Sequence, residues 1–120
     1  MSGMVVRRIK THVAQTGYVY QYYFVGKRPA LDGTQSTEYV FDVTCDRKTM
    51  FAVSVFVGRD ALESWAVQHG RPLSDTEQYA SAKLCLQQGF DTYTDMISAG
   101  RRLVVDSTNV EELLQALDLS

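Results

Sequence analysis

The 120-residue chain has few residues of the kinds that cross-link or interrupt a fold, since it contains two cysteines and two prolines. Cys45 and Cys85 are far apart and suit reduced thiols better than a disulfide framework. Uncharged apolar runs such as Met50–Gly58 fall short of the about 20 residues that a membrane-spanning helix needs. Near the amino terminus, basic residues follow the short apolar stretch, the reverse of a secretory signal. We therefore expect a cytoplasmic protein with no membrane partner.

Motifs for metal, nucleotide or catalysis are also missing. The side chains that could bind a transition metal are His12, Cys45, His69 and Cys85. They stand tens of residues apart, whereas zinc sites use closely spaced pairs of ligands. Gly26-Lys27-Arg28 lacks the first glycine and the hydroxyl residue of a phosphate-binding loop. We expect no metal, no cofactor and no catalytic residue.

The net charge of −2 is distributed unevenly along the chain. Residues 1–31 contain five basic and no acidic residues, whereas residues 32–120 contain seven basic and fourteen acidic ones. Such an uneven charge distribution steers an anionic partner toward the amino-terminal end, or lets the basic end of one copy meet the acidic end of another. The whole chain lacks the basic excess of nucleic-acid modules, so pairing within or between copies is favoured.

The amino-terminal half is typical of a β-sheet. Aromatic and β-branched residues dominate Tyr18–Val25, Glu38–Thr44 and Thr49–Val57, and Val5–Val13 alternates well enough for a further strand. These segments predict a four-stranded antiparallel sheet. Gly26–Ser36 contains a proline and an Asp-Gly pair without periodicity, which predicts a long loop.

Alternation divides the last two of these strands into a core face and an outer face. The residues expected in the core are Tyr39, Phe41, Val43, Phe51, Val53, Val55 and Val57. The strand over Tyr18–Val25 has no clearly polar face. It is therefore either covered on both sides or presents tyrosines on an open surface.

Two helices with an apolar stripe are predicted after the strands. Asp60 is the expected N-cap of the first, and Gly70 its end. Ser74 and Glu77 form a capping box that opens the second, which Gly89 should end. Both stripes are expected to lie on the sheet.

The carboxyl-terminal part predicts shorter elements. Residues 91–100 favour a short third helix, and residues 103–106 a short extra strand. Thr108 with Glu111 is a third capping box, followed by an apolar stripe of Val110, Leu113, Leu114 and Leu117. The fold expected for residues 1–120 is one α+β domain, an antiparallel sheet with three to four helices packed on one face.

The strands carry more aromatic residues than four short helices easily cover. Because aromatic residues are enriched at protein interfaces, the preferred hypothesis is a non-catalytic binding protein that forms a homodimer. Its expected interface anchors are Tyr20, Tyr22 and Phe24.

Two alternatives remain open. Basic residues interleaved with tyrosines would suit single-stranded nucleic acid or another anion, and the candidates are Arg8, Lys10, Lys27 and Arg28. A small enzyme or ligand-binding protein would instead have a pocket between sheet and helices, near Cys45 and His69. The sequence does not identify a substrate or a partner.

Overall fold

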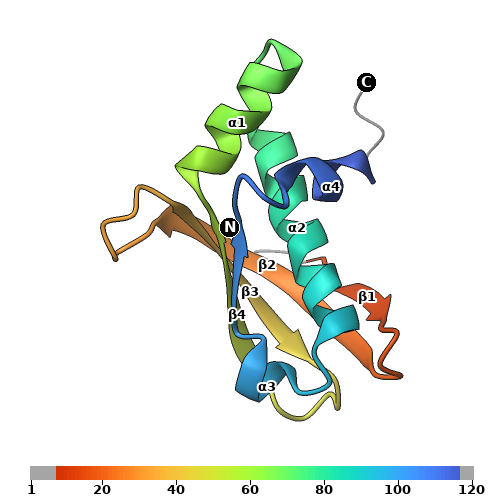
Figure 1. The fold of residues 1–120 in the computed structure, drawn as a ribbon. Coiled ribbons are helices and arrows are strands. Elements are labelled where there is room, and N and C mark those ends of the chain that lie inside the picture. Colours follow the sequence, from red (N-terminus) through yellow and green to blue (C-terminus); the bar gives the residue numbers. More distant parts are fainter. Residues whose placement is uncertain (1–7, 117–120) are drawn as a thin grey trace, which may run out of the picture.

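Five strands and four helices form the described part of the chain, residues 8–116, in a computed structural model (Figure 1). The strands are β1 (Lys10–Val13), β2 (Val19–Pro29), β3 (Thr37–Thr44), β4 (Phe51–Val57) and β5 (Arg102–Val105). The helices are α1 (Arg59–His69), α2 (Asp75–Thr92), α3 (Met96–Ala99) and α4 (Val110–Gln115). The α+β prediction is confirmed, with one strand more than the four-stranded sheet expected.

The strands lie side by side in the order of the chain, β1-β2-β3-β4-β5. The first four are antiparallel neighbours joined by turns, while β5 runs parallel to β4. A parallel neighbour requires a crossover, which the helices between β4 and β5 supply. The predicted short strand at 103–106 is β5. Of the first strand predicted over Val5–Val13, residues 5–7 lie outside the described residues, and β1 covers Lys10–Val13.

The loop predicted over Gly26–Ser36 is wrong in its first four residues, because β2 continues to Pro29. The register with β3 shifts between Phe24 and Gly26, so Val25 is the extra residue of a β-bulge. A bulge keeps the strand paired while it inserts one residue, and glycine fits there without steric cost. The basic pair that follows the bulge therefore belongs to the sheet.

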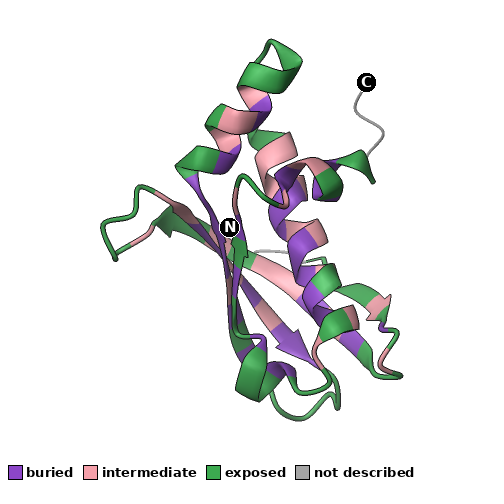
Figure 2. Cartoon of the chain, in the orientation of Figure 1, coloured by how far each residue is buried: buried purple, intermediate pink, exposed green. Residues whose placement is uncertain are grey.

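Helix α2 lies across one face of the sheet, and the core lies between them (Figures 1 and 2). All seven inward residues predicted on β3 and β4 are buried there. The inner side of α2 supplies Ala82, Cys85, Leu86 and Phe90. Helix α4 packs on α2 with its apolar stripe, of which Val110, Leu113 and Leu114 are buried as predicted. Leu117 lies outside the described residues.

Tyr20 and Tyr22 of β2 are covered by α2, and each is 2% exposed. The ring of Phe90 stacks on Tyr20 at 4.2 Å between centroids and lies 5.6 Å from Tyr22. Gln87 donates a hydrogen bond to the Tyr22 hydroxyl, so the polar end of Tyr22 is satisfied. These two tyrosines thus form part of the core.

Two of the predicted helix boundaries are confirmed and one is wrong. Gly70 ends α1 in the left-handed conformation, and Ser74 and Glu77 form the capping box of α2. Gly89 does not end α2, which continues to Thr92. A Cβ at Gly89 would lie 2.9 Å from a methyl group of Leu103, so the missing side chain lets α2 approach β5 closely.

The other two predicted caps are wrong. Helix α1 begins after Gly58 without a side-chain cap, and Asp60 instead accepts a hydrogen bond from the backbone N–H of Ser107. Thr108 donates to Asp106, and the N-cap position of α4 falls on Asn109. In both cases the acid or hydroxyl binds the turn after β5 rather than its own helix. The short third helix is present as α3, which buries Met96.

Removing the Phe90 ring, which covers Tyr20 and Tyr22, should destabilise the fold. We expect Phe90→Ala to lower the free energy of unfolding by about 3–5 kcal/mol, because it leaves a cavity beside Tyr20. Urea unfolding followed by circular dichroism measures this loss. Val67→Ala on the exposed side of α1 is the control and should change stability by about 0.5 kcal/mol or less. Equal losses of stability in the two variants would contradict the placement of Phe90 in the core.

The capping box of α2 predicts a pH-dependent contribution to stability. Hydrogen bonds from Arg71 and from the Ser74 backbone N–H lower the pKa of Glu77 from 4.5 to about 2. A lowered carboxyl pKa stabilises the fold above pH 4.5, and this contribution is lost as the pH falls toward 2. We expect Glu77→Gln to destabilise the protein by about 1 kcal/mol at pH 7, and by progressively less in acid. Urea unfolding at several pH values tests this, with Glu112→Gln as the control.

Candidate functional site: the open face of the sheet

The sheet face opposite α2 carries no helix in the described part of the chain (Figure 1). We call this surface the open face. The register sets its composition, because residues opposite one another on neighbouring strands point to the same side. Arg28 lies opposite Glu38, which lies opposite Phe56, which in turn lies opposite Val104. The open face is therefore a continuous surface over all strands.

Aliphatic side chains are exposed on the open face at both of its ends. Val13 is 71% exposed, Val19 48%, Val25 41% and Val104 47%. Ile9, just ahead of β1, is 63% exposed and borders a shallow hollow of about 470 Å³ with Gln21, Tyr23 and Met50. Exposed apolar side chains that gather on a sheet make this face a candidate binding surface.

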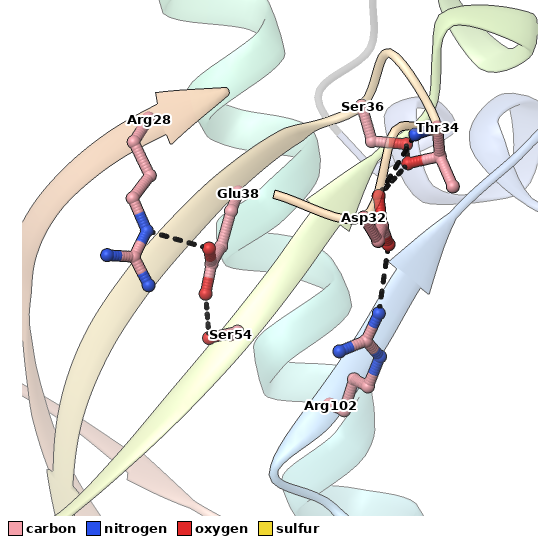
Figure 3. Close-up of polar contacts among 7 residues, drawn as sticks. All are labelled: Arg28, Asp32, Thr34, Ser36, Glu38, Ser54 and Arg102. Carbon is pink, nitrogen blue, oxygen red and sulfur yellow. Dashed lines mark hydrogen bonds and ion pairs between the residues drawn. The ribbon is translucent and has the colours of Figure 1, made fainter. Parts of the chain in front are cut away.

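A buried carboxylate lies near one end of the open face (Figure 3). Glu38 is 7% exposed and accepts two hydrogen bonds, from Arg28 Nε to Oε1 at 2.8 Å and from Ser54 Oγ to Oε2 at 2.6 Å. These bonds hold the pKa of Glu38 below its ordinary value, so the carboxylate stays charged. Three adjacent strands, β2, β3 and β4, are thereby linked by side chains.

A second ion pair lies beside the first (Figure 3). Arg102 Nη2 donates to Asp32 Oδ2 at 3.1 Å, while the backbone N–H and hydroxyl of Thr34 donate to Asp32 Oδ1. The Thr34 hydroxyl and then its N–H lower the pKa of Asp32. The Arg102 guanidinium also covers the ring of Phe56 at 4.2 Å from the centroid, a cation–π contact.

The two ion pairs border a hollow of about 350 Å³. Its lining consists of Arg28, Leu31, Asp32, Glu38, Phe56 and Arg102, and we call it the arginine hollow. Phe56 is 8% exposed, whereas Leu31 is 85% exposed. The hollow thus combines two guanidinium groups and two carboxylates with apolar surface.

The predicted interface residues lie on the other face of the sheet. Tyr20 and Tyr22 are buried under α2, as described above. Phe24 is half-buried and packs edge-on against Tyr79 of α2, 5.0 Å between ring centroids. The partner of these three rings within the chain is therefore α2. The surface that remains available for self-association on this sheet is the open face.

The structure does not bring the four predicted anion-binding residues together. Lys10 lies opposite Tyr22 on the side of α2, and Lys27 lies over the ring of Tyr39, 5.8 Å from its centroid. Arg28 lies on the open face with Glu38, and Arg8 is exposed ahead of β1. Binding of single-stranded nucleic acid through this set stays a prediction, and the arrangement does not favour it.

The residues suggested for a pocket between sheet and helices are also separated. Cys45 is exposed in the turn after β3. His69 stacks on Trp65 at the end of α1 and binds Glu111 at 2.7 Å. Buried side chains fill the space between α2 and the sheet. Burial raises the pKa of Cys85 to about 11, which keeps its thiol protonated at neutral pH.

The described residues contain no group of three or more His, Cys, Asp or Glu side chains that could hold a metal ion. The same residues include no helix with the length and hydropathy required to cross a membrane. Comparisons with protein-family models, with curated proteins and with solved structures give no match to this chain. The geometry of the open face is therefore the basis for any functional proposal.

The sequence pattern does not reveal the Glu38 network, because it predicts a loop at Arg28. Alternation with Tyr39, which is predicted in the core, puts Glu38 on the outer side of its strand. Uninterrupted alternation to Pro29 would put Arg28 on the core face with Tyr22 and Phe24, whereas the bulge at Val25 puts it opposite Glu38. The signal was the Val25-Gly26 pair, since a glycine within a strand pattern suggests a bulge.

Removing the Ser54 hydroxyl should weaken the network in a way that pH reveals. We expect Ser54→Ala to raise the pKa of Glu38 toward its ordinary value and to destabilise the protein by about 1 kcal/mol at pH 7. The loss should shrink in acid, because a lowered carboxyl pKa stabilises only while the carboxylate is charged. Carbon-13 NMR of the glutamate carboxyls measures this pKa. Ser98→Ala is the control, because it removes a hydroxyl that is bound to Asp95, and it should leave the pKa of Glu38 unchanged.

Proposed function

We propose that this protein is a non-catalytic binding protein that pairs with a second copy of itself through the open face. The observation that carries the proposal is the exposure of aliphatic side chains on one side of a sheet whose other side is the core, with Val13 at 71% as the extreme. Burial of such groups is the main favourable term in association. The proposal keeps the homodimer expected from the sequence but assigns it to a different face.

The size of the open face suits a stable dimer. Five strands spaced about 4.8 Å apart, with a mean length of roughly seven residues at about 3.3 Å, give a face of roughly 24 by 23 Å. The accessible area of such a corrugated surface exceeds its projection of about 550 Å². A standard interface buries about 800 Å² on each partner. Most of the open face would therefore take part.

The carboxylates Glu38 and Asp42 of the open face are already hydrogen-bonded within the chain. Both carboxylate oxygens of Glu38 accept hydrogen bonds, and Tyr23 donates to Asp42 at 2.9 Å. Burying a polar group is costly when it has no partner. Because these side chains have partners, a second copy can cover them at a much lower cost.

The edges of the sheet are less suited to pairing than its face. Strand β1 has four residues, and the part of β2 beyond it contains the bulge, Lys27 and Pro29. At the opposite edge, the carbonyl of Val104 accepts a hydrogen bond from the Asn109 side chain at 2.9 Å. Short strands, bulges, lysine and proline all oppose pairing between edges. The second copy is therefore expected to stack face to face.

Analytical ultracentrifugation tests the proposal. We expect the wild-type protein to sediment as a dimer, and Val19→Lys and Val104→Lys each to weaken dimerisation at least about tenfold, because a charge replaces a buried aliphatic group. Val67→Lys is the matched control, since Val67 is 84% exposed on α1, away from the open face. Circular dichroism verifies that each variant folds. A wild-type protein that stays monomeric at high concentration would contradict the proposal.

A further inference from the structure

The arginine hollow has the features of a ligand site in its own right. We propose that it binds a monocarboxylate carrying a small apolar group, either as a free acid or as the carboxyl end of a peptide. The proposal concerns the chemistry of Arg28, Arg102, Phe56 and Leu31. It does not depend on self-association, because these groups belong to one copy of the chain.

The hydrogen-bonding capacity left in the hollow is that of donors. Glu38 accepts hydrogen bonds on both of its oxygens, and so does Asp32. Arg28 donates only from Nε and Arg102 only from Nη2 to acceptors within the described residues. Each guanidinium has five N–H donors, so most of them remain for a ligand. A ligand that complements the hollow must therefore present acceptors.

The charges of the hollow limit the negative charge that a ligand can carry. Two guanidinium groups face two carboxylates, Asp32 and Glu38, so the lining is neutral as a whole. A planar carboxylate matches the fork of a guanidinium and adds one negative charge. A dianion such as phosphate would bring more negative charge close to Asp32 and Glu38. Carboxylate is therefore preferred to phosphate.

The apolar lining specifies the rest of the ligand. Phe56 lies beneath the Arg102 guanidinium, and Leu31 is exposed at the rim of the hollow. At about 350 Å³ the hollow is at the lower end of the range for small-molecule sites. A short branched aliphatic group would pack on Phe56 and cover Leu31. The ligand class is thus a small acid with an apolar body.

Both arginines are held in place before a ligand arrives. Arg28 is fixed by the buried Glu38, and Arg102 by Asp32 on one side and the Phe56 ring on the other. Their side chains are nevertheless 58% and 66% exposed, so the remaining donors are accessible. Anchoring reduces the loss of side-chain freedom that binding would otherwise require. This arrangement distinguishes the hollow from a pair of mobile surface arginines.

Calorimetric titration with 3-methylbutanoate tests the proposal, with its neutral amide and inorganic phosphate as comparison ligands. We expect the acid to bind, the amide to show no binding and phosphate to bind more weakly. Titration with acetyl-glycyl-leucine and its carboxyl amide separates a peptide end from a free acid. Absence of binding by both carboxylates, or equal binding of acid and amide, would overturn the proposal.

Two substitutions locate the binding at the hollow. Arg102→Gln removes donors, and Leu31→Asp adds a carboxylate at a position 85% exposed, where folding is unaffected. Each should weaken 3-methylbutanoate binding at least about tenfold. Arg59→Gln, an exposed arginine of α1 paired with Glu63, is the control and should bind like the wild type. Unchanged affinity in Leu31→Asp would overturn the assignment.

The titration is repeated in Val19→Lys, so that this proposal and the proposed dimer are judged separately. A face-to-face dimer would cover the hollow, so a monomeric variant that binds the acid at least as tightly as the wild type supports both proposals. If the wild-type protein is a monomer and still binds the acid, the dimer alone is wrong. If the wild-type protein is a dimer and neither it nor the monomeric variant binds a carboxylate, the hollow alone is wrong.

Discussion

The contact between Phe90 and the tyrosines of β2 is the one on which the rest of the fold depends. It holds the carboxyl end of α2 against β2 on the face of the sheet that forms the core, where the backbone of α2 lies closest to β4 and β5. The inward residues of β3 and β4 then complete a layer beneath the same helix. Because the described chain has one long helix, that helix can cover one side only. The exposure of Val19 and Val104 on the other side follows directly from this limit.

The open face is more than the uncovered remainder of the sheet. Leftover sheet faces in proteins that stay monomeric are usually polar, with hydrophobic residues alternating inward and polar residues outward. Here valines share that face with an ion-paired network that includes a 7% exposed glutamate. Because these polar side chains already form hydrogen bonds within one copy of the chain, burying them under a second copy costs less free energy. The same ordering keeps Arg28 and Arg102 in fixed positions around the arginine hollow.

Local patterns in the sequence predicted most of the fold. Alternation on β3 and β4, the Gly70 stop and the Ser74–Glu77 box depend on neighbouring residues, and each is confirmed. The predictions that are wrong depend on contacts between residues far apart in the sequence. Gly89 is required for packing on Leu103, far along the chain, rather than for ending a helix. The candidate site was missed for the same reason, since the partnership of Arg28 and Glu38 depends on strand register, and an unrecognised bulge hid that register.

The bulge at Val25 also sets how this chain can change in length. With one extra residue present, Lys27 lies above Tyr39 and Arg28 faces Glu38. Deleting Val25 would remove the bulge and leave Arg28 opposite Glu38, because Phe24 and Gly26 already pair with neighbouring residues of β3. Deleting a residue from a regularly paired part of the strand would instead shift the residues beyond it to the opposite face. An insertion after Pro29, in the turn between β2 and β3, would leave the alternation intact. Length variation in this hairpin is therefore tolerated at the bulge and at its tip.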